Sequence, residues 1–379
     1  MKIFIPKEHE ADETRVAVIP DTVGKLAKKG MQVAVESGVG LRCGHDDHAY
    51  QEAGAEIASD RQAMLGAADM VLRIGKPPMD EVAVLKRGCI HISFLDPFNE
   101  RDLVEKLQEC GISAISMEMI PRTTLAQKMD ALSSQANLAG YYAVVLAAER
   151  LSKILPMMMT PAGTIAPSRV FVIGAGVAGL QAIATAKRLG AHVDAFDTRP
   201  VVEEQVRSLG AKFVKVDLGE TGQTKDGYAK ELTEEQQQKQ REAMAKVCAQ
   251  SDIVITTAQL FGRKAPLIVT QEMVESMRPG SVIVDLAAES GGNVACTEAG
   301  KEVEVNGMRI IGLRNLPGHV AVHASQMYSA NLGNLIEAYW SEEDKAFGLD
   351  LEDEIIRGCL ITHDGELVNE MIKEAYAKQ

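Results

Sequence analysis

Short apolar runs alternate with longer amphipathic runs along the chain. Short runs rich in Val and Ile predict buried strands, and apolar positions three or four residues apart predict helices. In the first third, the expected strands are residues 2–5, 32–36, 70–74, 90–95 and 113–117. Helices are expected between these strands, at 21–29 and 100–110 among others. Because such alternation builds a parallel sheet covered by helices, residues 1–125 are expected to form a doubly wound domain.

A second series of apolar runs predicts a second parallel sheet. Its expected strands are residues 170–173, 191–197, 212–216, 252–257, 281–286 and 309–313. Two longer helical patterns, 131–151 and 325–340, are expected to connect the sheets. The predicted fold class is α/β, with two doubly wound Rossmann-like domains with parallel sheets, joined by long helices around a cleft. The first domain is expected to comprise residues 1–130 and 325–379, and the second 131–324.

Three consecutive methionines occupy positions 157–159, between the predicted connecting helix 131–151 and the first strand of the second series. Methionine is flexible and fills irregular gaps in a packed interior. We therefore expect these side chains to pack at the domain junction.

A polar stretch, residues 219–242, interrupts the second series, and Tyr228 is its only aromatic residue. A connection of this length in a compact domain is typical of a mobile lid over a binding site. A solvated loop followed by an exposed helix has the same composition. The pattern leaves both interpretations open.

Composition narrows the possible partners. The 379 residues suffice for two cores, and the formal net charge of −13 argues against a nucleic-acid or anionic membrane surface. No apolar run approaches the roughly 18 residues of a membrane span, and the chain begins directly in a predicted strand. We expect a cytoplasmic protein without direct membrane insertion. The cysteines and histidines are scattered without ligand spacing, so no metal is expected.

The second series opens on a strand, a glycine turn and a helix. Gly174, Gly176 and Gly179 have the G-x-G-x-x-G spacing that permits a tight turn, close approach of a pyrophosphate and close packing of the helix. The next strand ends at Asp197, 23 residues after Gly174. A carboxylate there accepts hydrogen bonds from an adenosine ribose and repels a 2′-phosphate, which favours NAD over NADP. Arg199 is the one nearby residue suited to a 2′-phosphate.

A second group of polar residues lies at the start of the predicted helix 131–151. It contains Arg122, Gln127, Asp130 and Ser133. Their spacing fits helix capping and a polar surface as well as it fits a binding site. The residues alone leave this choice open.

Several motifs resemble the alanine dehydrogenase and pyridine nucleotide transhydrogenase family. They are Pro-Lys-Glu at 6–8, Thr-Arg-Val-Ala at 14–17, Ala-Gln-x-Met-Asp at 126–130, Leu-Ser-Ser-Gln-Ala-Asn-Leu-Ala-Gly at 132–140, Met-Met-Met-Thr-x-Ala-Gly at 157–163, the glycine turn and Val-Asp-Leu-Ala-Ala-Glu-Ser-Gly-Gly-Asn at 284–293. Within the family, the closer likeness is to the NAD(H)-binding soluble component of proton-translocating transhydrogenases.

The resemblance implies roles for individual residues. It assigns the nicotinamide site to Arg122, Gln127, Asp130 and Ser133, and the mobile-loop tyrosine to Tyr228. The implied dinucleotide contacts are Gly174, Gly176, Val177, Ala178, Gly179, Asp197, Thr198, Arg199 and Ala258. The implied activity is hydride transfer between NADH and NADP⁺, the latter bound on a partner subunit. The implied partners are that NADP(H)-binding subunit, membrane-spanning subunits that couple the transfer to proton translocation, and a second copy in a homodimer. The chain would then lie at the inner membrane only through its partners.

Two alternatives remain. An alanine dehydrogenase of this family uses an arginine, a lysine, a histidine and an aspartate for substrate binding and proton transfer. At those places this chain has Arg15, Arg73, Phe94 and Glu289, while Lys76 and His91 are displaced. The chain is therefore expected to be a poor amino-acid dehydrogenase. A non-catalytic NAD sensor is the other alternative, and it would not need the nicotinamide-site residues.

Overall fold

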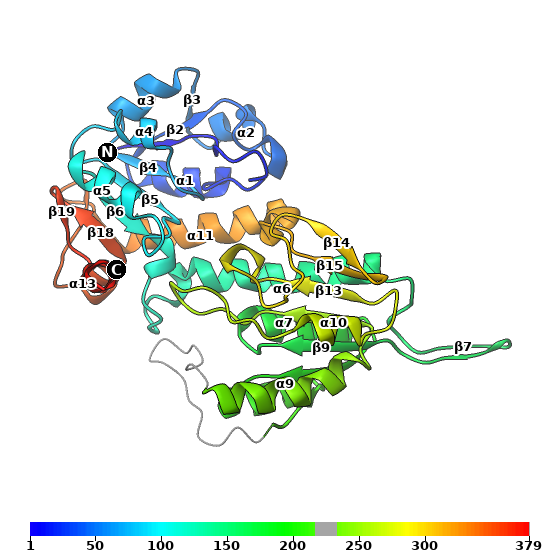
Figure 1. Cartoon of the computed structure of the whole chain (residues 1–379). Helices are drawn as coiled ribbons and strands as arrows, with labels where there is room; N and C mark the ends of the chain where they lie inside the picture. The colour runs from blue at the N-terminus through cyan, green and yellow to red at the C-terminus, as the bar shows by residue number, and fades with distance from the viewer. Residues whose placement is uncertain (217–232, 379) are drawn as a thin grey trace. The chain divides into compact units, whose positions relative to one another are not determined.

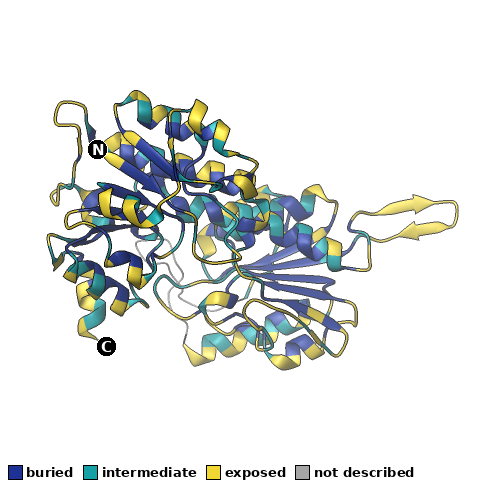
Figure 2. Cartoon of the chain, turned by 90° about the horizontal axis from the view of Figure 1, so that it is seen from above, coloured by how far each residue is buried: buried dark blue, intermediate teal, exposed yellow. Residues whose placement is uncertain are grey.

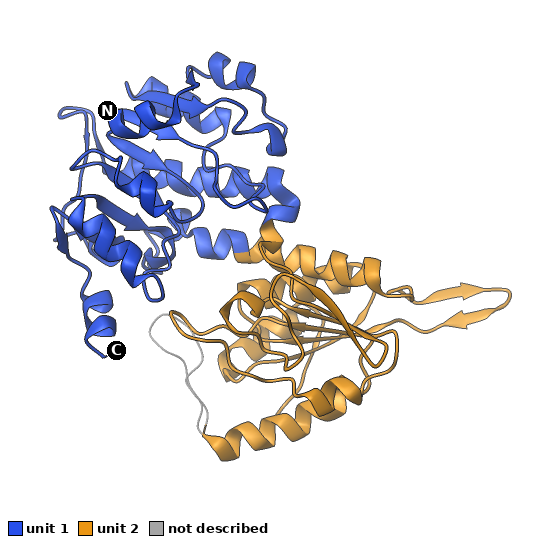
Figure 3. Cartoon of the chain, turned by 45° about the horizontal axis from the view of Figure 1, so that its top comes forward, with its two compact units in different colours: residues 1–135, 318–379 blue, residues 136–317 orange. Residues whose placement is uncertain are grey.

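The computed structural model describes residues 1–216 and 233–378, which form two compact units (Figure 3). Unit 1 consists of Met1–Gln135 and Gly318–Gln379, and unit 2 of Ala136–Pro317. Each unit contains its own largely parallel sheet with flanking helices (Figure 1), so the predicted α/β class with two doubly wound sheets is confirmed. Residues 219–232 of the predicted lid, including Tyr228, lie outside the described residues.

The sheet of unit 1 has the strand order β19-β18-β6-β5-β4-β1-β2-β3. Its strands are β1 (Lys2–Ile5), β2 (Gln32–Glu36), β3 (Glu56–Ala58), β4 (Met70–Leu72), β5 (Ile90–Ser93), β6 (Ser113–Ser116), β18 (Leu360–His363) and β19 (Glu366–Leu367). The helices of the unit are α1 (Pro20–Lys28), α2 (Asp47–Glu52), α3 (Arg61–Ala67), α4 (Met79–Val82), α5 (Arg101–Glu109), α11 (Ala321–Tyr339), α12 (Glu354–Cys359) and α13 (Glu370–Ala377). A small hairpin, β16 (Trp340–Ser341) and β17 (Ala346–Phe347), follows α11.

One face of helix α11 is buried in the interior of unit 1. Tyr328, Leu332 and Leu335 on this face are fully buried. Two serines on the same helix also accept hydrogen bonds from the backbone of the segment before α1, from Val16 N to Ser325 Oγ and from Ile19 N to Ser329 Oγ, both at 3.0 Å. These bonds satisfy backbone donors that no strand partner reaches, and they fix the path of the chain next to Arg15.

The sheet of unit 2 has the strand order β11-β10-β9-β12-β13-β15-β14. Its strands are β9 (Arg169–Ile173), β10 (His192–Phe196), β11 (Lys212–Phe213), β12 (Ile253–Thr256), β13 (Val282–Asp285), β14 (Glu302–Val305) and β15 (Met308–Ile311). The helices are α7 (Val177–Arg188), α8 (Glu203–Ser208), α9 (Glu234–Cys248), α10 (Gln271–Glu275) and most of α6 (Ala131–Arg150), within which the two units divide.

Strand β9 is buried on both faces. Val170 and Val172 belong to the core that contains Ile183 of α7, whereas Phe171 and Ile173 belong to the core that contains Met244 of α9. A strand covered by helices on both sides requires apolar residues at successive positions rather than alternate ones. This is why the run at 170–173 predicts the centre of the sheet.

Both sheets differ from the predicted fully parallel arrangement at one edge. Strand β18 is antiparallel to β6 and β19, and β14 is antiparallel to β15. Two-residue turns, Asn306-Gly307 and Asp364-Gly365, close the hairpins with positive φ at both residues. Asn-Gly and Asp-Gly are the sequences that favour such turns.

The predicted packing of the methionines at a domain junction is wrong. Met158–Thr160 (β7) and Gly163–Ile165 (β8) pair with each other as an antiparallel hairpin, which is exposed along its length (Figure 2). Met157 and Met159 are 60% and 75% exposed. The reason is the Pro161-Ala162 turn, which folds the chain back so that Met159 pairs with Thr164.

No helix within the described ranges has both the length and the apolar character to cross a membrane.

Candidate functional site

The glycine turn of unit 2 joins β9 to the N-terminus of α7. Gly174 has a φ of +96°, a conformation that side-chain-bearing residues rarely adopt. Gly179 packs so closely on the turn that a Cβ there would lie 1.9 Å from the carbonyl oxygen of Gly174. The turn and the helix are therefore held together by close backbone packing.

Gly176 serves a different purpose in this turn. It is the N-cap of α7, and a Cβ at this position would meet no atom within 4 Å. Open space beside a helix N-terminus suits a phosphate, because the free N–H groups of the first turn point toward it. Val177 and Ala178, the next two residues, form the start of this first turn.

Asp197 follows β10 and is 9% exposed. Its Oδ2 accepts a hydrogen bond from Ala175 N in the glycine turn, at 2.7 Å. Arg199 supplies three further donors: its backbone N and Nε lie 2.8 and 2.9 Å from Oδ1, and its Nη2 lies 2.8 Å from Oδ2. These hydrogen bonds raise the pKa of Arg199. Thr198 lies between these two residues. The predicted ribose-binding segment, 197–199, is therefore closed by the ion pair between Asp197 and Arg199.

Ala258 is held by a residue that the sequence did not single out. The side chain of Asn293 accepts from Ala258 N at 3.0 Å and donates to Ala258 O at 2.8 Å. Asn293 is itself fully buried, and its backbone N donates to Asp285 at the end of β13. Asn293 is the last residue of the motif at 284–293. Its place in that motif is the sequence signal that could have indicated its role in positioning Ala258.

The four predicted nicotinamide-site residues lie in unit 1. Asp130 precedes α6 and caps it, because Oδ1 accepts from Ser133 N at 2.9 Å and Oδ2 accepts from Ser133 Oγ at 2.6 Å. Arg122 and Gln127 are exposed, and Asp130 and Ser133 are half-buried. Asp130 therefore caps the helix, as one of the two interpretations expects. The side chains of Arg122 and Gln127 remain accessible to a ligand.

The segment that carries these residues is anchored to α11. The short helix η3 (Gln127–Met129) buries Met129, which is 2% exposed. Asn331 and Asn334 of α11 donate to the carbonyl oxygen of Lys128, at 2.9 and 3.1 Å. The two residues that follow Gln127 are thus fixed in place, so its exposed amide projects from an anchored backbone.

Arg15 is occupied by a carboxylate of the same chain. Its Nε and Nη2 donate to the two oxygens of Glu13 at 2.8 and 2.6 Å, and its Nη1 donates to Gln135 at 2.9 Å. Each side chain of the ion pair is only 10% exposed. Burial alone lowers the pKa of Arg15, but the hydrogen bonds and charge of Glu13 raise it above its ordinary value.

The displaced candidates for proton transfer are engaged elsewhere. His91 lies inside the sheet, where its Nε2 is 3.0 Å from Ser93 Oγ, and burial together with the charge of Arg73 lowers its pKa to about 3. Arg73 is fully buried and ion-paired with Glu81, and Lys76 pairs with Glu100 at 2.6 Å. Phe94 packs against Tyr328 with ring centroids 5.3 Å apart. His91 is therefore neither accessible nor protonated at neutral pH.

Comparison with known proteins places these features in a family. Residues 4–139 match the model of the alanine dehydrogenase/PNT N-terminal domain, and residues 143–370 match that of the C-terminal domain. The chain is 47% identical over 376 residues to the first part of NAD(P) transhydrogenase subunit alpha from Rhodospirillum rubrum, covering 97% of this chain and 98% of the relative. The crystal structure of transhydrogenase from Sinorhizobium meliloti matches with a TM-score of 0.87 at 44% identity, covering 97% of this chain and all of that one.

Alanine dehydrogenases are more distant. The enzyme from Bacillus subtilis is 29% identical over 328 residues, which cover 84% of this chain and 80% of the enzyme.

Proposed function

The chain belongs to the alanine dehydrogenase and pyridine nucleotide transhydrogenase family, and we propose that it is the NAD(H)-binding component of a proton-translocating NAD(P) transhydrogenase. In this role it binds NADH and passes a hydride to NADP⁺ held on a partner subunit, leaving NAD⁺ and NADPH. The names of the relatives at 47% and 44% identity support this assignment over the whole chain.

The adenosine half of NADH belongs to unit 2 in this proposal. The open position at Gly176 and the first turn of α7 receive the pyrophosphate, and Asp197 receives the ribose hydroxyls. A carboxylate that is 9% exposed disfavours a 2′-phosphate both by its charge and by the absence of solvent around it. The site therefore selects NADH.

The nicotinamide half belongs to the anchored segment of unit 1. Hydride transfer between two nicotinamide rings needs no acid or base from the protein, because no proton moves with the hydride. It needs the two rings held close together in the right orientation without water between them. Gln127 and Ser133 supply hydrogen-bonding groups for a carboxamide, and Arg122 and Asp130 complete the polar surroundings.

The ion pair between Arg15 and Glu13 is the observation that favours this function over alanine dehydrogenase. A keto acid or amino acid needs a guanidinium for its carboxylate and an accessible acid for its keto oxygen. Here an internal carboxylate already holds the guanidinium at two points. Phe94 stands at the place of that histidine, and the displaced His91 does not replace it as an acid, because it is buried with a pKa of about 3.

The proposed partners follow from this division of labour. One subunit must present NADP⁺ to the nicotinamide site, and membrane-spanning subunits must couple the transfer to proton movement. This chain then reaches the membrane surface through those subunits. We also assign a second copy of the chain to the exposed hairpin β7–β8, whose methionines lie uncovered in the described structure.

Mixing the chain with an isolated NADP(H)-binding partner domain tests the proposal. Rapid reduction of an NADP⁺ analogue by NADH is expected only when both proteins are present. The same chain is expected to oxidise NADH with pyruvate and ammonium at no more than a background rate. Turnover of pyruvate at ordinary enzyme rates would establish the dehydrogenase instead. Failure of both assays, with NADH still bound, would indicate a sensor.

A further inference from the structure

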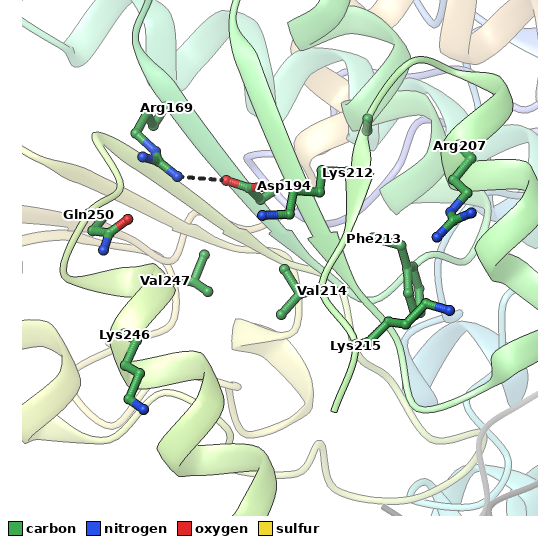
Figure 4. A pocket seen from close by; sticks show the side chains of 11 residues that line it. Arg169, Asp194, Arg207, Lys212, Phe213, Val214, Lys215, Lys246, Val247 and Gln250 are labelled. Carbon is green, nitrogen blue, oxygen red and sulfur yellow. Dashed lines mark hydrogen bonds and ion pairs between the residues drawn. The ribbon is translucent and has the colours of Figure 1, made fainter. Parts of the chain in front are cut away.

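A basic pocket lies on unit 2, along the edge strand β11. Its lining residues are Arg169, Asp194, Arg207, Ala211, Lys212, Phe213, Val214, Lys215, Lys246, Val247 and Gln250 (Figure 4). Five of these residues are cationic and one is anionic, in a chain whose formal net charge is −13. Gathering like charges around one cavity raises the free energy of the folded chain unless an anion binds there.

The cations of this basic pocket are only partly neutralised by the protein. Arg169 pairs with Asp194 at 3.2 Å, and Arg207 and Lys215 share Glu203 at 2.7 and 3.0 Å. Neither Lys212 nor Lys246 forms an ion pair within the described structure, and both are exposed. Arg169 Nε is buried without a hydrogen-bond partner among the described residues. The pocket therefore contains two unpaired ammonium groups and an unused guanidinium donor.

The size and floor of the basic pocket suit an organic anion rather than a bare ion. Its volume is about 660 Å³, within the roughly 300–1,000 Å³ of small-molecule sites. Phe213, Val214 and Val247 supply apolar surface between the charged groups, as Figure 4 shows. Arginine and lysine together are the side chains that bind phosphate groups best.

The basic pocket is separate from the glycine turn. Neither the residues of the turn nor Asp197 line the basic pocket. Lys246 and Val247 come from the C-terminal end of α9, whereas the turn leads into α7, and the two helices pack in the cores on opposite faces of the sheet. A ligand here leaves the NADH site open.

We propose that the basic pocket binds an organic phosphate of nucleotide size at the same time as NADH binds the glycine turn. The phosphates contact Lys212, Lys246 and Arg169, and the organic moiety lies against Phe213. This site is independent of hydride transfer, so its test does not depend on the transhydrogenase assignment.

Calorimetric titration of the full chain with ADP, after saturation with NADH, tests the proposal. ADP is expected to bind one further site. The double variant Lys212→Gln/Lys246→Gln is expected to weaken ADP binding by about tenfold to a hundredfold, since it removes two charge-assisted contacts. Lys239→Gln is the matched control, because it removes an exposed lysine of the same helix that lies outside the pocket. The control should bind ADP as the unaltered chain does.

Four results would overturn the proposal. Failure of the NADH-saturated chain to bind ADP removes the site. Equal ADP affinity in the double variant shows that Lys212 and Lys246 do not contact the phosphates. An equal loss in Lys239→Gln shows a general effect of charge. Sulfate binding as tightly as ADP shows a site for an inorganic ion only.

Discussion

Arg199 and Ala175 N together use the full hydrogen-bonding capacity of Asp197. The carboxylate has about four lone-pair positions, and it accepts from Ala175 N and from three nitrogens of Arg199, all at 2.7–2.9 Å. A ribose hydroxyl therefore has to displace a donor. The side chain of Arg199 is the one that can move without opening the glycine turn.

This relationship predicts opposite outcomes for two substitutions. Asp197→Ala removes the ribose acceptor and is expected to weaken NADH binding by about tenfold or more. Arg199→Ala frees two acceptor positions and is expected to keep or improve NADH affinity. Titration of NADH fluorescence measures both. Equal losses in the two variants would mean that the ion pair as a unit, rather than the carboxylate, contacts the ribose.

Substitutions of two glycines in the same turn are expected to have different effects, one on the free energy of unfolding and the other on NADH affinity. Gly179→Ala places a Cβ 1.9 Å from Gly174 O and should lower the free energy of unfolding by about 1–3 kcal/mol or more. Gly176→Ser places a side chain in open space at a position where serine caps a helix well, so stability should be unchanged. NADH binding should nevertheless fall about tenfold or more, because the side chain fills the expected pyrophosphate position. Denaturant titration and NADH titration of both variants check this, and full NADH affinity in Gly176→Ser would place the pyrophosphate elsewhere.

The central strands of each sheet were predictable from sequence, whereas the antiparallel pairing at one edge of each sheet was not. Residues 3–5 and 170–173 are buried at every position, so their apolar character is continuous and unambiguous. The hairpin β14–β15 carries an Asn306-Gly307 signal, but the alternating Glu302–Val305 is half-exposed and reads as a polar linker. The methionines of the β7–β8 hairpin have the composition of a core, and composition alone does not reveal that nothing in the described structure covers them.

The glycine turn and the strand end before Asp197 were predictable from the sequence, but the contacts of these residues were not. The spacing of Gly174 and Gly176 predicted the turn between β9 and α7, and the apolar run before Asp197 predicted where β10 ends. Residue spacing alone does not show where a side chain points, so it did not predict the hydrogen bonds from Arg199 to Asp197. The same is true of Asn293, which reaches Ala258 from 35 residues away.

Gln127 is expected to matter for orientation more than for affinity. Gln127→Asn shortens the side chain by one methylene, and a misplacement of about 1 Å can slow a reaction about a hundredfold. The hydride-transfer rate with an NADP(H)-binding partner domain should fall by about tenfold or more, with NADH affinity nearly unchanged. Because Gln127 is exposed, folding should be unaffected. Lys128→Gln, at the neighbouring exposed position, is the control and should leave the rate unchanged. Parallel losses of rate and affinity in Gln127→Asn would assign the side chain to binding alone.

Glu8 is expected to make the stability of unit 1 depend on pH. Burial raises its pKa to about 7, against the opposing effects of Arg73 and of hydrogen bonds from Ile74 N and Gly75 N. The folded chain then holds this proton at pH values where the unfolded chain has released it. The stabilisation from the protonated group is complete below the ordinary pKa of 4.5 and is lost as the pH rises toward 7. Glu8→Gln keeps a neutral side chain and should flatten this part of the pH profile. Denaturant midpoints measured from about pH 5 to about pH 8, which spans most of this range, check the difference. Parallel profiles for the two chains would contradict it.

The hairpin β7–β8 is expected to hold two copies of the chain together. Its two strands pair only with each other, and Met157, Met159 and Ile165 remain 60%, 75% and 50% exposed. A two-stranded ribbon is marginally stable alone in water, so an exposed apolar ribbon indicates that a partner surface covers it. Replacing Met157, Met159 and Ile165 by serine should shift the protein toward monomer in light-scattering measurements, without loss of NADH binding at the glycine turn. Thr164→Ser, within the same hairpin, is the matched control and should leave the mass unchanged. A monomeric unaltered chain, or a dimer that survives the triple substitution, would remove the hairpin from the interface.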